Sequence, residues 1–89
     1  GAKGILLVSD DKEFLAVPPR AEVKSTIGAG DSAVAGFLSG LADGKELKEC
    51  LVYAAAAGTA TTLCQGTALA QKEDFERILP QVKLTTLEK

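Results

Sequence analysis

Short apolar runs in the first part of the chain predict a β-hairpin. Residues 5–8 and residues 13–17 are largely apolar, and a polar stretch over residues 9–12 separates them. Pro18 and Pro19 follow the second run and end it, because proline cannot donate a hydrogen bond to a strand ladder. The chain then runs on to a loop that contains two glycines.

After this loop the apolar positions change to a helical period. They recur with i, i+3, i+4 and i+7 spacing at Val34, Phe37, Leu38 and Leu41. This spacing places the four side chains on one side of a helix, and it predicts an amphipathic helix over residues 31–41.

Three more elements are predicted further along the chain. A second helix is expected over residues 46–63, and Asp43 and Glu46 stand at the spacing of a capping box near its start. A short helix is expected over residues 72–79, where a proline stops it. Residues 82–87 are predicted to form a final edge strand.

The second helix has one face of mostly small side chains, which lets another group come close. The first helix is one candidate for this contact, because Gly36 and Gly40 would allow the two backbones to approach. A flat ligand ring is the other, although alanine is common in helices without any ligand. The residues of this face are Leu47, Leu51, Ala54, Ala55 and Gly58.

The glycine loop before the first helix has the composition of an anion site. Gly28 and Gly30 permit backbone angles that other residues avoid, and they let a ligand approach the chain. A helix that begins near Asp31 directs its free N–H groups and positive dipole end at this loop. A carboxylate beside such donors is what phosphoryl transfer to a hydroxyl requires. The alternative is that Asp31 only caps the helix.

Length and charge restrict the classes of protein that fit. The 89 residues make at most one small domain. The net charge is −2 with acidic and basic residues interspersed, so no basic face is expected for nucleic acid or anionic lipid. The longest apolar run is far shorter than the ~18 residues of a membrane helix, and nothing resembles a signal peptide. These features predict a cytoplasmic protein without a membrane partner.

The two cysteines are expected to stay reduced. If Cys50 and Cys64 lie on one helix, their separation along its axis is roughly 21 Å. A disulfide needs α-carbons within about 7 Å, so the two cannot pair within the chain.

Several motifs together resemble the ribokinase-like carbohydrate kinases, the PfkB family. Residues 25–36, with the sequence STIGAGDSAVAG, are similar to the family's C-terminal signature. Residues 1–4 resemble its nucleotide-contacting Gly-x-x-Gly turn, and residues 54–63 with 65–67 resemble the helix and turn that close over the adenine. The resemblance implies an α/β, three-layer ribokinase-like fold. Residues 1–89 would be the C-terminal, nucleotide-binding part of a single kinase domain.

The resemblance also implies roles for individual residues around ATP. Asp31 matches the catalytic base, and the backbone N–H groups of the glycine loop match the anion hole for the transferring phosphoryl group. The catalytic residues implied are Gly28, Ala29, Gly30 and Asp31. The nucleotide-binding residues implied are Gly1, Ala2, Lys3, Gly4, Ala55 and Thr59.

Two metal ions are implied by the same resemblance. Backbone oxygens at a third group of positions hold a monovalent cation, usually potassium, in many relatives. Magnesium would be held mostly by the ATP phosphates and by acidic residues upstream, so no carboxylate of this chain is assigned to it. The cation positions are Ser25, Ile27, Thr61, Cys64, Gly66 and Ala68.

At two places the sequence resembles particular subgroups of the family. Ser25-Thr26 is similar to the phosphosugar kinases of the family, and the tail from Lys72 is most similar to the 1-phosphofructokinases. ATP-dependent phosphorylation of fructose 1-phosphate is therefore the expected activity, by a homodimeric parent enzyme. Kinases of fructose 6-phosphate or tagatose 6-phosphate, or a non-catalytic nucleotide-binding module, are the alternatives. The 89 residues alone are expected to be inactive.

Overall fold

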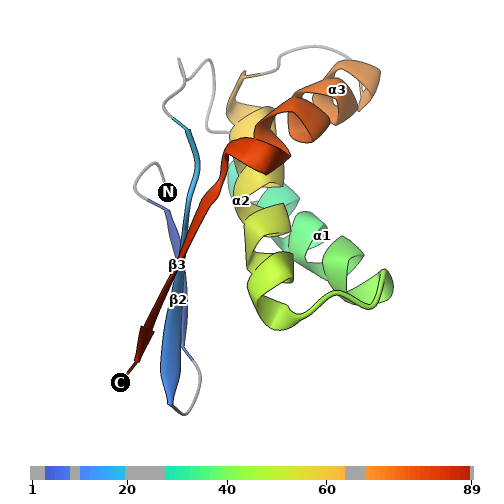
Figure 1. Ribbon diagram of the computed structural model, residues 1–89. Coiled ribbons are helices and arrows are strands. Elements are labelled where there is room, and N and C mark those ends of the chain that lie inside the picture. Colours follow the sequence, from blue (N-terminus) through green and yellow to red (C-terminus); the bar gives the residue numbers. More distant parts are fainter. Residues whose placement is uncertain (1–3, 9–10, 20–27, 64–67, 89) are drawn as a thin grey trace.

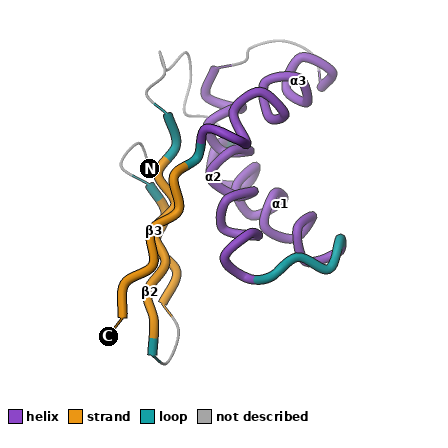
Figure 2. Tube along the Cα trace, viewed as in Figure 1, coloured by secondary structure: helices purple, strands orange, loops and turns teal. Residues whose placement is uncertain are grey.

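One antiparallel sheet and three helices make up the computed structural model, which describes residues 4–8, 11–19, 28–63 and 68–88 (Figure 1). The sheet order is β1-β2-β3. The helix α2 lies between the sheet and α1, and α3 crosses one end of α2 (Figure 2). The strands are β1 (Ile5–Val8), β2 (Lys12–Val17) and β3 (Lys83–Glu88). The helices are α1 (Ala29–Ala42), α2 (Leu47–Leu63), α3 (Ala68–Ile78) and a 3-10 turn, η1 (Leu79–Gln81).

The predicted hairpin and the predicted edge strand are both confirmed. In the hairpin, Ile5 pairs with Ala16 and Val8 pairs with Glu13. The last strand returns to pair with the other side of β2, where Val17 faces Lys83. The first and last strands of the chain are thus joined through β2, and α2 can pack across both.

One cluster of the core lies between the sheet and α2. Ala16 of β2 is fully buried against Leu51 and Ala55 of α2, and half-buried side chains from all three strands surround them. A second cluster joins α2 to α3 through Ala56, Ala60 and Ile78. The ring of Phe75 meets that of Tyr53 edge to face, with centroids 5.7 Å apart.

The helices α1 and α2 pack closely because glycines of α1 face α2. A Cβ atom placed on Gly36 would lie 2.7 Å from the carbonyl oxygen of Tyr53, and one placed on Gly40 would lie 3.0 Å from the sulfur of Cys50. Helix packing through Gly36 and Gly40 is therefore confirmed. Of the predicted face, Gly58 does meet α1, whereas Leu51 and Ala55 pack against the sheet.

Three predicted helix ends need correction. The first helix begins at Ala29, two residues before the predicted start, because Gly28 serves as its N-cap. Asp43 is the C-cap of α1, and the carbonyl of Glu46 accepts the first hydrogen bond of α2, so the two do not form a capping box. The helix α3 begins at Ala68, four residues earlier than predicted.

The apolar stripe of α1 is not buried within the described chain. Because the glycine face of the helix packs on α2, Val34, Leu38 and Leu41 point outward and are 59%, 56% and 44% exposed. The far side of the sheet also carries exposed apolar residues, including Leu6 and Val8. The chain therefore presents two apolar surfaces that nothing within the described residues covers.

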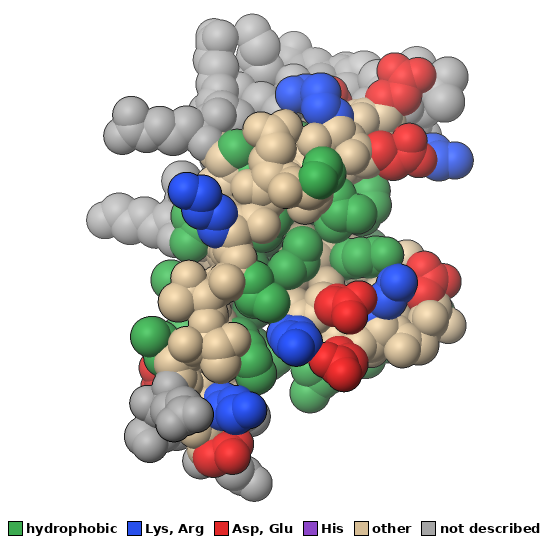
Figure 3. All heavy atoms as spheres, viewed as in Figure 1, with side chains coloured by type: hydrophobic (Ala, Val, Ile, Leu, Met, Phe, Trp, Pro, Cys, Tyr) green, Lys and Arg blue, Asp and Glu red, His purple; other side chains and the backbone are tan. Residues whose placement is uncertain are grey.

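Charged side chains of both signs lie next to one another on the face shown in Figure 3. Among the described residues, ion pairs join Arg77 to Asp74 at 2.8 Å and Lys48 to Glu46 at 3.5 Å. The thiol of Cys50 is free and buried. Within the described ranges, none of the helices has both the length and the apolar character that crossing a bilayer requires.

Candidate active site

The first turn of α1 has the geometry of an anion site. Gly28 has φ 78° and ψ 0°, a left-handed conformation that suits glycine and disfavours other residues. Its carbonyl accepts a hydrogen bond from the N–H of Ser32 at 2.9 Å, which closes the first helical turn. The N–H groups of Ala29, Gly30 and Asp31 precede that bond, so the helix itself offers them no acceptor.

Two of these three residues are exposed in the described part of the chain. Gly30 and Asp31 are exposed, and a Cβ atom on Gly30 would meet no heavy atom within 4 Å. A phosphoryl oxygen could therefore approach the donors, with the carboxylate of Asp31 in the same turn. Since Gly28 is the N-cap, Asp31 occupies the third helical position, and the prediction that it could act as the cap is wrong.

The helix α2 supports this turn from behind. Gly58 comes close to the start of α1, where its Cβ would lie 3.4 Å from the carbonyl oxygen of Ala29. One turn further along α2, the hydroxyl of Thr61 donates a hydrogen bond of 2.6 Å to the hydroxyl of Ser32. Sequence reasoning could not find this contact, because two hydroxyl residues 29 positions apart form no local pattern.

The candidate nucleotide-binding residues lie in two parts of the chain, four at its start and two on α2. Gly1, Ala2 and Lys3 lie outside the described residues. Gly4 has φ 113°, and its Cβ would lie 2.6 Å from the carbonyl oxygen of Ala16, so only glycine fits beside the hairpin. The other two candidates, Ala55 and Thr59, are on α2.

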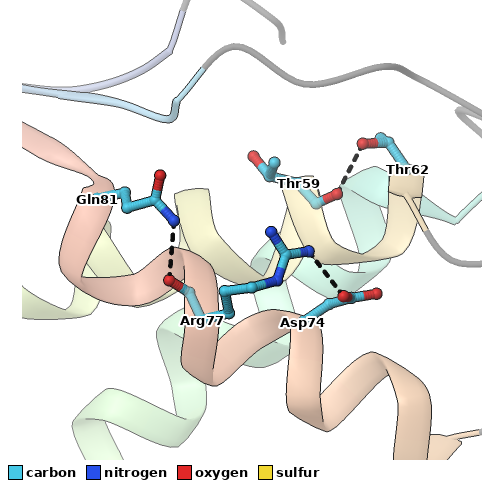
Figure 4. A network of polar contacts seen from close by, with 5 residues as sticks. All are labelled: Thr59, Thr62, Asp74, Arg77 and Gln81. Carbon is cyan, nitrogen blue, oxygen red and sulfur yellow. Dashed lines mark hydrogen bonds and ion pairs between the residues drawn. The ribbon is translucent and has the colours of Figure 1, made fainter.

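The two candidates on α2 differ in how much surface they offer a ligand. Ala55 is 3% exposed and packs toward the sheet. Thr59 is half-buried, and its carbonyl accepts a hydrogen bond from the hydroxyl of Thr62 at 2.7 Å (Figure 4). Of the two, Thr59 has the more accessible side chain.

Of the candidate cation residues, the structure describes two. Thr61 lies in the last turn of α2, with its Cγ2 4.0 Å from the position of a Cβ on Gly28. Ala68 is the first residue of α3. Ser25, Ile27, Cys64 and Gly66 lie outside the described residues. In the part of the chain that the structure describes, no three acidic, cysteine or histidine residues gather into a metal site.

A hollow of about 340 Å³ lies between α1, α2 and α3, beside the first turn of α1. Small side chains form most of its wall, and the Ser32 and Thr61 hydroxyls are part of it. Its lining residues are Ser32, Ala35, Gly36, Ser39, Ala57, Ala60, Thr61, Lys72 and Phe75.

Comparison with known families decides the class of protein. The sequence model of the pfkB family carbohydrate kinases matches residues 1–74, which include the hairpin, the glycine turn, α1 and α2. The chain belongs to the pfkB family. The predicted family is thus confirmed, and the sheet with its helices is part of an α/β ribokinase-like fold.

Curated members of the pfkB family support the same assignment. The chain is 40% identical over 78 residues to the ATP-dependent 6-phosphofructokinase isozyme 2 of Escherichia coli, covering 88% of this chain and 25% of that protein. It is 34% identical over 84 residues to the 1-phosphofructokinase of Bacillus subtilis, covering 94% of this chain and 27% of that protein. The chain therefore spans about a quarter of the length of these relatives.

Solved structures of the family share the fold over nearly the whole chain. A Staphylococcus aureus protein assigned as a phosphofructokinase superposes with a TM-score of 0.90 at 33% identity, over 99% of this chain and 28% of that one. The Escherichia coli phosphofructokinase-2 in complex with potassium gives a TM-score of 0.80 at 38% identity, over 90% of this chain and 26% of that one.

Proposed function

We propose that the protein containing this chain transfers a phosphoryl group from ATP to a hydroxyl of a phosphosugar. The observation that carries the proposal is the first turn of α1, where the exposed Asp31 stands beside three N–H groups without helical acceptors. We propose fructose 1-phosphate as the acceptor and fructose 1,6-bisphosphate as the product, because several matching relatives are 1-phosphofructokinases. Fructose 6-phosphate and tagatose 6-phosphate are the alternatives, the first favoured by the similarity to a 6-phosphofructokinase.

In the proposed reaction, each group of the turn has a separate task. The Asp31 carboxylate takes the proton from the acceptor hydroxyl, whose oxygen then forms a bond to the γ-phosphorus as the bond to the ADP oxygen breaks. The N–H groups of Ala29, Gly30 and Asp31 hold the equatorial oxygens of the group in transfer. Fixed donors of this kind typically contribute ~3–4 kcal/mol each to transition-state stabilisation.

The same proposal assigns binding sites to the nucleotide and to the metal ions. Residues 1–4, Ala55 and Thr59 would line the nucleotide site, with Thr59 offering the more accessible side chain. Potassium would bind backbone oxygens at the cation positions and strengthen the local positive field. Magnesium would bind the ATP phosphates and carboxylates outside this chain.

We also propose that the chain is the C-terminal part of a single kinase domain. Its two uncovered apolar surfaces, on α1 and on the far side of the sheet, would then pack against the rest of that domain. The chain's coverage of a quarter of its relatives supports this arrangement. A homodimeric parent enzyme in the cytoplasm is proposed on the family resemblance, and the free thiol of Cys50 suits a reducing compartment.

The proposed substrate is tested by steady-state kinetics of the full-length kinase with ATP and three phosphosugars. We expect kcat/KM for fructose 1-phosphate to exceed that for fructose 6-phosphate and tagatose 6-phosphate by at least about tenfold, which corresponds to ~1.4 kcal/mol of differential transition-state binding. A preference for another phosphosugar would keep the reaction and change the acceptor. Absence of turnover with all three would contradict the proposed function.

A further inference from the structure

Thr61 makes a direct contact with the end of the glycine turn, although it belongs to a different helix. Its hydroxyl donates a hydrogen bond of 2.6 Å to the hydroxyl of Ser32, which follows Asp31 directly. Its methyl carbon lies 4.0 Å from the position of a Cβ on Gly28, the residue that precedes the anion-binding segment. One side chain of α2 is therefore hydrogen-bonded to the residue that follows Asp31, and its methyl group lies on the side of Gly28 where a Cβ would stand.

The glycine turn has no side-chain restraint of its own at its start. Gly28 is the N-cap of α1 and has no side chain, so the usual capping hydrogen bond is not made. Within the turn, the bond from the N–H of Ser32 to the carbonyl of Gly28 fixes the curvature of the backbone but not its position against α2. The Thr61 hydroxyl bond and the close approach of Gly58 to Ala29 supply that position.

We propose that Thr61 is a positioning residue. It holds the first turn of α1 so that the N–H groups of the turn and the Asp31 carboxylate keep their positions relative to the reacting groups. The inference rests on the proposed function, since it concerns the same turn. Neither the hydroxyl of Thr61 nor that of Ser32 needs to touch substrate. A catalytic group displaced by about 1 Å can lose roughly 10²-fold in rate, so a smaller displacement of the turn is expected to cost about tenfold.

The test uses the full-length kinase and the variant Thr61→Val. Valine keeps the shape of the threonine side chain but cannot donate a hydrogen bond. We expect kcat to fall by about tenfold while KM for ATP and for the phosphosugar changes less than about twofold, because the loss affects alignment in the transition state. Valine also keeps the backbone carbonyl that is proposed to bind potassium. Assays at saturating potassium chloride then exclude weaker potassium binding as the cause of a lower kcat.

Two further variants separate positioning from stability. Thr61→Ser restores the hydroxyl and is expected to restore kcat to within about threefold of the wild-type value. Ser32→Ala removes the other partner of the bond, so combining it with Thr61→Val should cost no more than Thr61→Val alone. Thr62→Val is the matched control, because that hydroxyl bonds within its own helix to the Thr59 carbonyl and should leave kcat unchanged (Figure 4).

The possible outcomes distinguish the positioning role from the proposed function. A Thr61→Val enzyme with a lower melting temperature but wild-type kcat would overturn the positioning role and leave the proposed function intact. Losses from Thr61→Val and Ser32→Ala that multiply would also overturn it, since the two hydroxyls would then act separately. A wild-type kinase that turns over no phosphosugar would overturn both the proposed function and this inference.

Discussion

The variant Asp31→Asn is expected to lower kcat of the full-length kinase by about 10³-fold, within the range that a positioned general base contributes. Asparagine has nearly the same shape but cannot accept the proton of the acceptor hydroxyl. Asp31 is exposed in the first turn of α1, so its carboxylate is accessible for that proton. Steady-state ADP release at saturating ATP and phosphosugar measures the loss.

Stability should be nearly unaffected by the same substitution. Because Gly28 rather than Asp31 is the N-cap, the variant loses only the interaction of a first-turn acid with the helix dipole. That interaction contributes about 0.3–1 kcal/mol at an exposed site. Asp43→Asn, at the other end of α1, is the matched control and should leave kcat unchanged. Wild-type turnover by Asp31→Asn would mean that Asp31 is not the base.

The variant Gly36→Ala is expected to destabilise the kinase by about 1–3 kcal/mol, the usual cost of an added group in a well-packed interior. Its new Cβ would lie 2.7 Å from the Tyr53 carbonyl oxygen and 2.8 Å from the Cβ of Ala57. Backbone atoms cannot move aside as a flexible side chain can, so α1 must shift away from α2. Since α1 carries Asp31, kcat should fall together with the melting temperature.

Gly30→Ala provides the control for this packing prediction. Gly30 is on the same helix, but its Cβ would meet no heavy atom within 4 Å among the described residues. Alanine is a better helix former than glycine by up to about 1 kcal/mol, so the melting temperature should stay the same or rise. If Gly36→Ala and Gly30→Ala gave the same melting temperature, the close contact of α1 with α2 would be contradicted.

Local signals in the sequence were sufficient to predict where the strands lie. Apolar runs bounded by polar residues and prolines located the hairpin, and the tail after the last helix located β3. These signals act over a few residues, so they do not depend on the rest of the fold. The helix ends were less predictable, because an N-cap glycine such as Gly28 resembles any loop glycine until its positive φ is seen.

The amphipathic pattern of α1 did not predict which side of the helix packs against α2. Val34, Leu38 and Leu41 have the spacing of a buried stripe, yet the helix packs on α2 through Gly36 and Gly40. Glycines contribute nothing to an apolar pattern, although they permit the closest packing. The stripe itself is explained if the rest of the kinase domain covers it, which a pattern within 89 residues cannot show.

The candidate site was partly predictable for a similar reason. The order Gly28, Ala29, Gly30, Asp31 before a helical period indicated the candidate anion site, because all its parts are consecutive in sequence. The support from Thr61 depends on how two helices meet, so only the structure brings it together with Ser32. Long-range contacts between common polar residues leave no signal in a single sequence.

The central claim, phosphoryl transfer from ATP to a phosphosugar hydroxyl, is tested most directly by identifying the product. The full-length kinase is incubated with ATP and fructose 1-phosphate, and the reaction is followed by phosphorus NMR. We expect one new phosphomonoester on the C6 hydroxyl and one ADP for each sugar consumed. Release of inorganic phosphate without a new phosphomonoester, or no consumption of ATP with this or either alternative sugar, would contradict the claim.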